Sequence, residues 1–272
     1  MGGVERIAAA FAAAADEDRA ALMPYMMGGF PDRETSAAVA RAYADAGADL
    51  IELGVPFSDP LADGPVIHEA ATRALEGGAN LDAMLALGAE VAAELPVVAM
   101  AYVNMVLARG QERFAGDLAA AGFSGVIVPD LPPEDAGELR AALAQASLAF
   151  IPLVGPTTPA ARRQSICEAA LGFVYVVSDT RTTGERESLP AELADLVAAV
   201  REDSDVPVAV GFGIGTPEQV AEVGRIADGV IVGSRLVRAV AEAGEATSAA
   251  AAVSGFIRAA REALSSPAAA TP

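Results

Sequence analysis

The sequence is short of cysteine, tryptophan and other aromatic residues, and these shortages limit what the protein can be. Its 272 residues include one cysteine, Cys167, so no disulfide can form within the chain, which suits a reducing cytoplasm. Cys167 lies in an alanine-rich segment of helical pattern, where we expect an inert, partly buried thiol. Tryptophan is absent and aromatic residues make up only 5%, so the core has to be packed mainly with aliphatic side chains.

Positive charge is also scarce. Lysine and arginine together number 18 against 37 aspartates and glutamates, which gives a formal net charge of −19. Such a surface argues against binding to nucleic acid or to anionic membranes. No apolar run reaches the roughly 18 residues that a membrane span needs, and residues 1–19 indicate an amphipathic helix rather than a signal peptide. We therefore expect a cytoplasmic protein in which backbone N–H groups hold any anionic ligand.

Short apolar runs alternate with segments of helical pattern along the whole chain. The runs are 22–27, 49–55, 97–102, 126–128, 148–154, 173–177, 208–210 and 230–232. Continuous apolar runs are typical of parallel strands covered on both faces. Eight such units in this length predict a (β/α)8 TIM barrel with an extra N-terminal helix. A doubly wound open sheet is the alternative, but it usually carries a G-x-G-x-x-G after its first strand, which is absent here.

The domain organisation follows from the same pattern. No linker divides the chain, so we expect residues 1–272 to form a single barrel domain. The last residues, 265–272, are small and proline-containing, and we expect them to form a disordered tail.

The stretch LIELGVPFSDPLADGP, residues 50–65, combines a buried strand with an acidic loop. Glu52 lies among apolar residues, where a carboxylate is costly without a function or a partner, and Asp63 follows on the loop. Apolar surroundings raise the pKa of a carboxyl, so Glu52 is suited to give and take a proton. Glu52 could instead be a structural carboxylate paired with a base, and Asp63 could simply form a turn. Asp59 and Asp130 are more typical of turns and helix caps.

Glycine-rich loops follow the last two strands of the predicted barrel. They are residues 211–215, GFGIG, and residues 233–235, GSR. Many barrels hold a phosphate group at these two loops, because small residues let backbone N–H groups approach an anion closely. The pattern predicts a phosphorylated small-molecule substrate, unless these glycines only make tight turns.

Aromatic residues and the single histidine complete the list of candidates. Tyr102 and Tyr175 follow predicted strands, where a phenol could orient a ligand or simply pack. His68 is the only histidine, and a lone histidine cannot form a metal site. Because no cluster of Cys, His and Asp has ligand spacing, we predict no metal site and expect His68 to be a solvated helix residue.

Several motifs between residues 23 and 237 resemble the tryptophan synthase alpha chain family. They are IELGVPFSDPLADGPVI, MPYMMGGFPD, AYVNMV, GVIVPDLP, GFVYVVS, TTGER, GFGI and VGSRLV. The resemblance implies a (β/α)8 barrel that cleaves indole-3-glycerol phosphate into indole and glyceraldehyde 3-phosphate in tryptophan biosynthesis. It implies that Glu52 is the acid–base residue, that Asp63 hydrogen-bonds the indole N–H, and that Tyr175 belongs to the catalytic set. It places the phosphate against Gly184, Phe212, Gly213, Gly233 and Ser234.

The resemblance also indicates an indole pocket and a lid. We expect Tyr25, Met100, Tyr102 and Leu131 to form the apolar mouth, and Thr183 of the strand-six loop to reach Asp63 on closure. The loop departs from the family pattern: Arg181-Thr182-Thr183-Gly184 replaces the usual Gly-Val-Thr-Gly, with Asp179 just before it. His68 and Met27 stand where the family often has Gln and Thr.

Members of this family work with a separate beta chain. The alpha chain needs no metal or organic cofactor, since pyridoxal phosphate belongs to the beta chain of an alpha2beta2 assembly. The positions that dock the beta chain match Pro56, Asp59 and Asn104. We therefore predict a catalytic alpha subunit with a small phosphorylated substrate.

Three alternatives remain beside this prediction. The altered lid suggests a stand-alone indole-3-glycerol phosphate lyase that releases free indole. A catalytically weak subunit that only activates a beta chain is disfavoured by the presence of Glu52 and Asp63. Another phosphosugar barrel, such as a ribulose-phosphate epimerase, typically needs metal-binding His and Asp residues that the lone His68 cannot supply.

Overall fold

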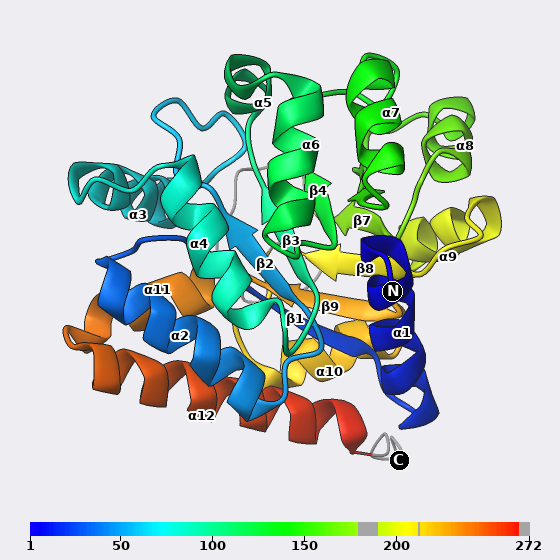
Figure 1. The fold of residues 1–272 in the computed structure, drawn as a ribbon. Coiled ribbons are helices and arrows are strands. Elements are labelled where there is room, and N and C mark those ends of the chain that lie inside the picture. The colour runs from blue at the N-terminus through cyan, green and yellow to red at the C-terminus, as the bar shows by residue number, and fades with distance from the viewer. Residues whose placement is uncertain (179–189, 212, 267–272) are drawn as a thin grey trace.

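The computed structural model describes residues 1–178, 190–211 and 213–266, and Figure 1 shows how their elements are arranged. The strands are β1 (Ala21–Met27), β2 (Ile51–Gly54), β3 (Val97–Met100), β4 (Gly125–Ile127), β5 (Ala149–Phe150), β6 (Leu153–Val154), β7 (Val174–Val177), β8 (Val208–Gly211) and β9 (Gly229–Val232). The helices are α1 (Gly3–Asp16), α2 (Arg33–Ala46), α3 (Pro65–Glu76), α4 (Leu81–Val91), α5 (Val103–Arg109), α6 (Gln111–Ala120), α7 (Gly137–Gln145), α8 (Ala160–Glu168), α9 (Leu193–Asp203), α10 (Pro217–Gly224), α11 (Ser234–Ala243) and α12 (Ala246–Ser265).

The strands form one parallel sheet in the order β5-β4-β3-β2-β1-β9-β8-β7-β6. Its two outermost members, β5 and β6, are consecutive pieces of the run 148–154, which the sequence predicted as a single strand. The Ile151 N–H donates to the Val126 carbonyl at 3.0 Å, and the Tyr175 N–H donates to the Pro152 carbonyl at 3.0 Å. This run therefore bonds to β4 on one side and to β7 on the other, which closes the (β/α)8 barrel. Pro152 has no N–H, so it interrupts the ladder and splits the strand.

The inside of the barrel holds its own cluster of buried side chains, separate from the layer between sheet and helices. Its members on the strands or directly beside them include Met23, Val98, Ile127, Ile151, Phe173, Ala209 and Ile231. Helix α1 closes the N-terminal end of the barrel, because its Ile7 and Phe11 belong to the same cluster. The centroid of the Phe11 ring lies 5.7 Å from that of Phe173. The amphipathic N-terminal helix predicted from the sequence is confirmed, and its apolar face is the floor of the barrel.

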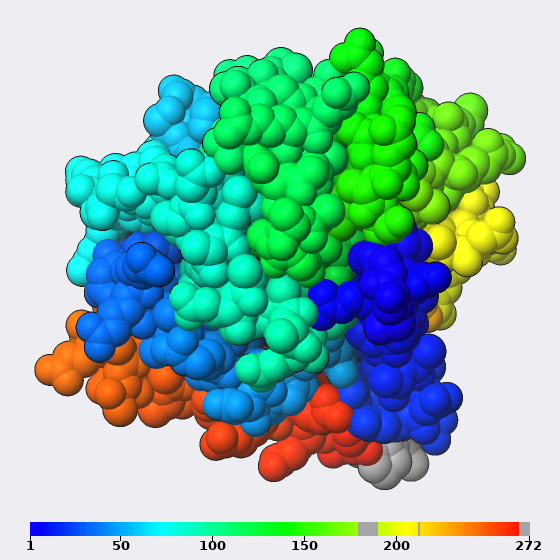
Figure 2. Space-filling view, in the orientation of Figure 1, coloured from blue at the N-terminus to red at the C-terminus, as the bar shows by residue number. Residues whose placement is uncertain are grey.

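Helix α1 is also fixed to three turns between helices and strands. The Arg6 guanidinium donates to the carbonyls of Ala92 and Gly122, and the Val4 N–H donates to the Ser147 carbonyl at 3.3 Å. These turns lead from α4, α6 and α7 into the sheet. In Figure 2 the dark blue side chains of α1 accordingly fit against this part of the molecule.

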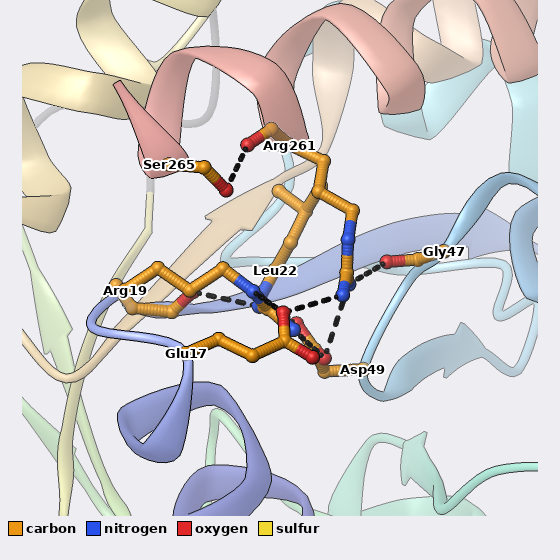
Figure 3. Close-up of polar contacts among 8 residues, drawn as sticks. Glu17, Arg19, Leu22, Gly47, Asp49, Arg261 and Ser265 are labelled. Carbon is orange, nitrogen blue, oxygen red and sulfur yellow. Dashed lines mark hydrogen bonds and ion pairs between the residues drawn. The ribbon is translucent and has the colours of Figure 1, made fainter. Parts of the chain in front are cut away.

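A cluster of charged residues lies at the same end of the barrel (Figure 3). The side chain of Arg19 is only 1% exposed, and its guanidinium makes two bonds to the Asp49 carboxylate, of 2.6 and 2.8 Å. Arg19 also pairs with Glu17 at 2.8 Å. From α12, which lies along α2 (Figure 1), Arg261 donates to Glu17 and to the Gly47 carbonyl, both at 2.8 Å. The cluster therefore joins the C-terminal helix to the start of the barrel.

Three further observations concern the expectations from sequence. Helix α5 was not predicted, and α12 extends to Ser265, while residues 267–272 of the expected tail lie outside the described residues. Cys167 is buried, and burial raises the pKa of its thiol to about 11, as expected of an inert thiol. Within the described ranges, no helix has the length and apolar character to cross a membrane.

Candidate active site

Alternation along the strands brings the candidate residues to the C-terminal end of the barrel. Side chains two positions apart on a strand face the same side. Inward-facing Met23 on β1 is therefore followed by Tyr25, and Leu50 before β2 is followed by Glu52. The register pairs Tyr25 with Glu52 on neighbouring strands. Phe173, just before β7, is followed in the same way by Tyr175 on β7, so these polar groups form the top layer of the barrel interior.

A cavity opens above this layer. Its wall combines polar side chains from β1, β2, β7, α11 and the loop after β2 with aliphatic side chains. Its lining residues are Tyr25, Glu52, Asp63, Ile67, Met100, Ile127, Leu153, Tyr175, Gly213, Ile214, Ile231, Gly233 and Ser234. In a (β/α)8 barrel, this end is where active sites lie.

Glu52 is buried and only partly satisfied. Glu52 is 5% exposed, and its Oε2 atom has no hydrogen-bond partner within the described part of the chain. Burial raises the pKa of the Glu52 carboxyl from 4.5 to about 8, and the negative charge of Asp63 adds to this shift. At neutral pH, Glu52 is therefore a protonated acid that faces the cavity.

Asp63 reaches the same cavity from the loop between β2 and α3. Burial raises the pKa of its carboxyl to about 6, while the Tyr102 hydroxyl and the positive charge of His68 act in the opposite direction. The two carboxyl groups therefore differ in charge between about pH 6 and about pH 8. One cavity thus holds a proton donor and a carboxylate, the arrangement that acid–base catalysis needs.

The phenol groups of two tyrosines pack against glycines of neighbouring strands. A Cβ atom at Gly54 would lie 2.2 Å from the hydroxyl oxygen of Tyr25, and one at Gly211 would lie 2.1 Å from that of Tyr175. Only glycine therefore leaves room for each phenol at the mouth. Burial raises the pKa of both phenols well above 10, so both stay neutral.

The part of the cavity wall formed by the loops after β8 and β9 suits an anion. Gly213 adopts a left-handed φ of +82°, and Gly233 and Ser234 stand at the N-terminus of α11, where backbone N–H groups and the helix dipole favour negative charge. The Gln219 side chain supports this region, since its Oε1 accepts from the Gly215 N–H at 2.7 Å. Of the described residues, Gly213, Ile214, Gly233 and Ser234 line this part of the cavity, and no arginine does.

The structure brings most of the predicted site residues together. Of these, the cavity is lined by Glu52, Asp63, Tyr175, Tyr25, Met100, Gly213, Gly233 and Ser234. Gly184, Phe212 and Thr183, together with Arg181 and Asp179 of the strand-six loop, lie outside the described residues. Among the described residues, no group of three or more His, Cys, Asp or Glu side chains could hold a metal ion.

Two predicted pocket residues lie elsewhere. Tyr102 does not line the cavity but packs beneath the loop that carries Asp63, and Leu131 lines a separate hollow with Pro129 and Pro132. Several aliphatic residues that do line the cavity were not predicted from the sequence. They are Ile67, Ile127, Leu153, Ile214 and Ile231. The period of two along the strands could have identified Ile127 and Leu153, because each is inward-facing at the C-terminal end of its strand.

The positions predicted to dock a partner lie away from the cavity. Asp59 and Asn104 are exposed, whereas Pro56 is buried in this chain. Large apolar side chains stand beside them in sequence: Leu61 is 83% exposed and Leu107 is 59% exposed. His68 is exposed on α3, as expected of a solvated helix residue.

Comparison with known proteins places this site in a family. A family model described as tryptophan synthase alpha chain matches residues 11–264. The tryptophan synthase alpha chain of Chloroflexus aggregans is 45% identical over 237 residues, which cover 86% of this chain and 89% of that protein. The one from Carboxydothermus hydrogenoformans is 47% identical over 236 residues, covering 86% and 88%. A chain of tryptophan synthase from Mycobacterium tuberculosis superposes with a TM-score of 0.90 at 37% identity, covering 96% of this chain and 99% of that one. The chain therefore belongs to the tryptophan synthase alpha chain family.

Proposed function

We propose that Glu52 and Asp63 carry out the carbon–carbon cleavage of this enzyme. As a tryptophan synthase alpha chain, the protein is a lyase that cleaves indole-3-glycerol phosphate to indole and glyceraldehyde 3-phosphate in tryptophan biosynthesis. The observation that supports these roles is the pair of carboxyl groups in one cavity, Glu52 buried and protonated and Asp63 partly buried and ionised at neutral pH.

The proton transfers of the reaction fit this pair. Glu52 donates its proton to C3 of the indole ring, which leaves positive charge on the ring nitrogen. The bond between C3 and the glycerol carbon then breaks, its electron pair returns to the ring, and the 3′-hydroxyl loses its proton to Glu52 as the aldehyde forms. Glu52 is regenerated, and no proton is gained or lost overall. A well-placed acid–base group of this kind accelerates reactions by roughly 10²- to 10⁴-fold.

Asp63 and the phenols act on the charge and the orientation of the ring. An ionised Asp63 accepts a hydrogen bond from the indole N–H. This hydrogen bond becomes stronger as positive charge develops on the ring nitrogen. The neutral hydroxyl of Tyr175 lies beside Glu52 in the lining of the cavity and helps to orient the substrate. Tyr25, Met100 and the other apolar lining residues hold the flat ring.

The phosphate group belongs at the glycine-rich side of the cavity. Gly213, Gly233 and Ser234 offer backbone N–H groups there, and the residues Gly184 and Phe212 belong to the same proposed set. A substrate held in this way spans the cavity, with the indole at the carboxyl groups and the phosphate at α11.

The absence of lysine excludes one class of aldolase mechanism. The sequence contains no lysine, so an imine between enzyme and carbonyl, the device of Schiff-base aldolases, is not open to this chain. Proton transfer between Glu52 and the substrate needs neither a metal nor an organic cofactor. We therefore propose that the alpha reaction uses side chains alone and that pyridoxal phosphate belongs to a partner beta chain.

We also propose that this chain docks a tryptophan synthase beta chain in an alpha2beta2 assembly in the cytoplasm. Asp59 and Leu61 are exposed on the loop after β2, and Asn104 and Leu107 are exposed on α5, which follows β3. Exposed large apolar side chains of this kind suit a protein–protein contact. The alternative, a stand-alone lyase, receives no support from the relatives, which are named as alpha chains.

The test is indole release from indole-3-glycerol phosphate by the purified chain, with and without a tryptophan synthase beta chain. We expect slow release by the chain alone and strong activation by the partner. Fast release that the partner does not change would support the stand-alone lyase instead. If neither preparation releases indole, the assignment of substrate is wrong.

A further inference from the structure

The loop that carries Asp63 has little internal support. It spans residues 55–64 between β2 and α3, and within the described chain no backbone N–H from residue 56 to residue 63 donates to another backbone carbonyl. A loop without backbone-to-backbone hydrogen bonds does not by itself fix a carboxylate against a substrate atom. The support has to come from outside the loop.

Tyr102 supplies that support at both ends of the loop. Its ring stacks on the Phe57 ring, with the centroids 5.1 Å apart and the planes 22° from parallel. Its hydroxyl oxygen accepts from the Ala62 N–H at 3.1 Å. Because that oxygen already accepts a bond, its single proton is free to point to another acceptor, and the Asp63 carboxylate is the neighbouring one.

Tyr102 is itself held rigidly. It is 3% exposed and stands between β3 and α5. The Ala101 N–H before it donates to the Ile127 carbonyl at 3.0 Å, and the Val103 N–H after it donates to Asp130 Oδ1 at 2.9 Å. Tyr102 and its two neighbours in the chain therefore connect the ends of β2, β3 and β4.

We propose that Tyr102 is a positioning residue for the cleavage reaction, which holds the Asp63 loop through its ring and directs its hydroxyl proton to the Asp63 carboxylate. This inference rests on the proposed role of Asp63, and it replaces the place in the indole pocket that the sequence suggested for Tyr102. The hydrogen bond favours the ionised form of Asp63, the form that can accept the indole N–H. Other titratable groups that act on or with Asp63 are Glu52 on β2, His68 on α3, Tyr25 on β1 and Tyr175 on β7.

The first test removes the hydroxyl group of Tyr102 and keeps its ring. In Tyr102→Phe we expect kcat to fall roughly 10- to 100-fold, the effect of losing a hydrogen bond to a charged group. The acid limb of the pH–rate profile should move to higher pH, because Asp63 loses a donor that stabilised its charge. Inhibition by inorganic phosphate should stay within about twofold of wild type, since Tyr102 does not touch the phosphate side.

The matched control is Tyr43→Phe. The Tyr43 hydroxyl, on α2, also makes a buried hydrogen bond, to the Tyr25 carbonyl at 3.1 Å. Its loss should lower the melting temperature but leave the acid limb in place. A second pair tests the stacking: Phe57→Leu should lower kcat, and Phe57→Tyr, which keeps an aromatic ring, should restore most of it.

A measurement without turnover separates this inference from the proposed function. Carbon-13 NMR of protein labelled at the aspartate carboxyl carbons, with Asp63→Asn to identify the resonance, gives the pKa of Asp63 directly. We expect this pKa to be higher in Tyr102→Phe than in wild type and in Tyr43→Phe. If wild type does not cleave the substrate, the proposed function fails and the NMR shift still decides whether Tyr102 controls Asp63. If the resonance and the acid limb are unchanged in Tyr102→Phe, the inference is wrong.

Discussion

Replacement of Glu52 by glutamine should make the protein less active and, at alkaline pH, more stable. Glutamine has the shape of glutamic acid but cannot transfer a proton, so indole release should fall by about 10²- to 10⁴-fold. Binding of the phosphate group should persist, because the phosphate is proposed to contact Gly213, Gly233 and Ser234 and not Glu52.

The stability effect follows from the pKa of the buried carboxyl. Folding raises this pKa from 4.5 to about 8, so the native state holds a proton that the unfolded chain releases across that range. Stability of the wild type should therefore fall as pH rises from 4.5 to 8, by about 1.4 kcal/mol per pH unit. The difference sums to roughly 3–5 kcal/mol at pH 8.5. In Glu52→Gln the side chain is neutral at every pH, so this decline should be absent.

Urea unfolding followed by circular dichroism at pH 5, 6, 7, 8 and 8.5 measures the effect. The difference in unfolding free energy between variant and wild type should grow in favour of the variant as pH rises. The difference in unfolding free energy at pH 5 contains any cost of placing an amide in the cavity that does not depend on pH. Subtracting it leaves the part that changes with pH. The control is Glu69→Gln on the exposed face of α3, which should keep the wild-type curve. Parallel curves for Glu52→Gln and wild type would refute the reasoning, because they would mean that Glu52 is charged in the folded protein.

Three further predictions concern the site and the barrel. The pH profile of kcat/KM should rise through about pH 6, as Asp63 loses its proton, and fall through about pH 8, as Glu52 loses its own; a profile that is flat between pH 5 and pH 9 would contradict the assignment. Gly54→Ala should destabilise the protein by about 1–3 kcal/mol and raise KM, because the new Cβ would lie 2.2 Å from the Tyr25 hydroxyl oxygen; urea unfolding and steady-state kinetics measure both effects. Arg19→Met should cost about 3–5 kcal/mol in urea unfolding, since it removes both hydrogen bonds from Arg19 to a nearly buried aspartate and leaves only Arg261, 3.5 Å from the Asp49 carboxylate; a loss below about 1 kcal/mol would show that the cluster adds little.

Sequence alone determined the architecture and predicted several of the residues that line the candidate site. The alternation of apolar runs with helical segments is a local signal, and eight repeats of it predicted the barrel. A glutamate inside an apolar strand is costly wherever that strand is buried, so the neighbours of Glu52 in the chain are enough to mark it as a functional residue. The loops with Gly213 and Gly233 were recognisable in the same way, because only a few backbone arrangements need so many glycines.

Only the tertiary structure decided how the strands and loops meet. Pro152 splits a strand that the apolar pattern predicts as continuous, and the barrel still closes, because Ile151 and Pro152 bond to different neighbouring strands. The lining of the cavity and the place of Tyr102 depend on contacts between segments that are far apart in the chain. Tyr102 touches Ala62, 40 residues away, and no local pattern encodes that distance. Residue type and spacing thus identified the carboxyl groups that we propose to react, whereas the contacts that hold them in place depend on packing between distant strands.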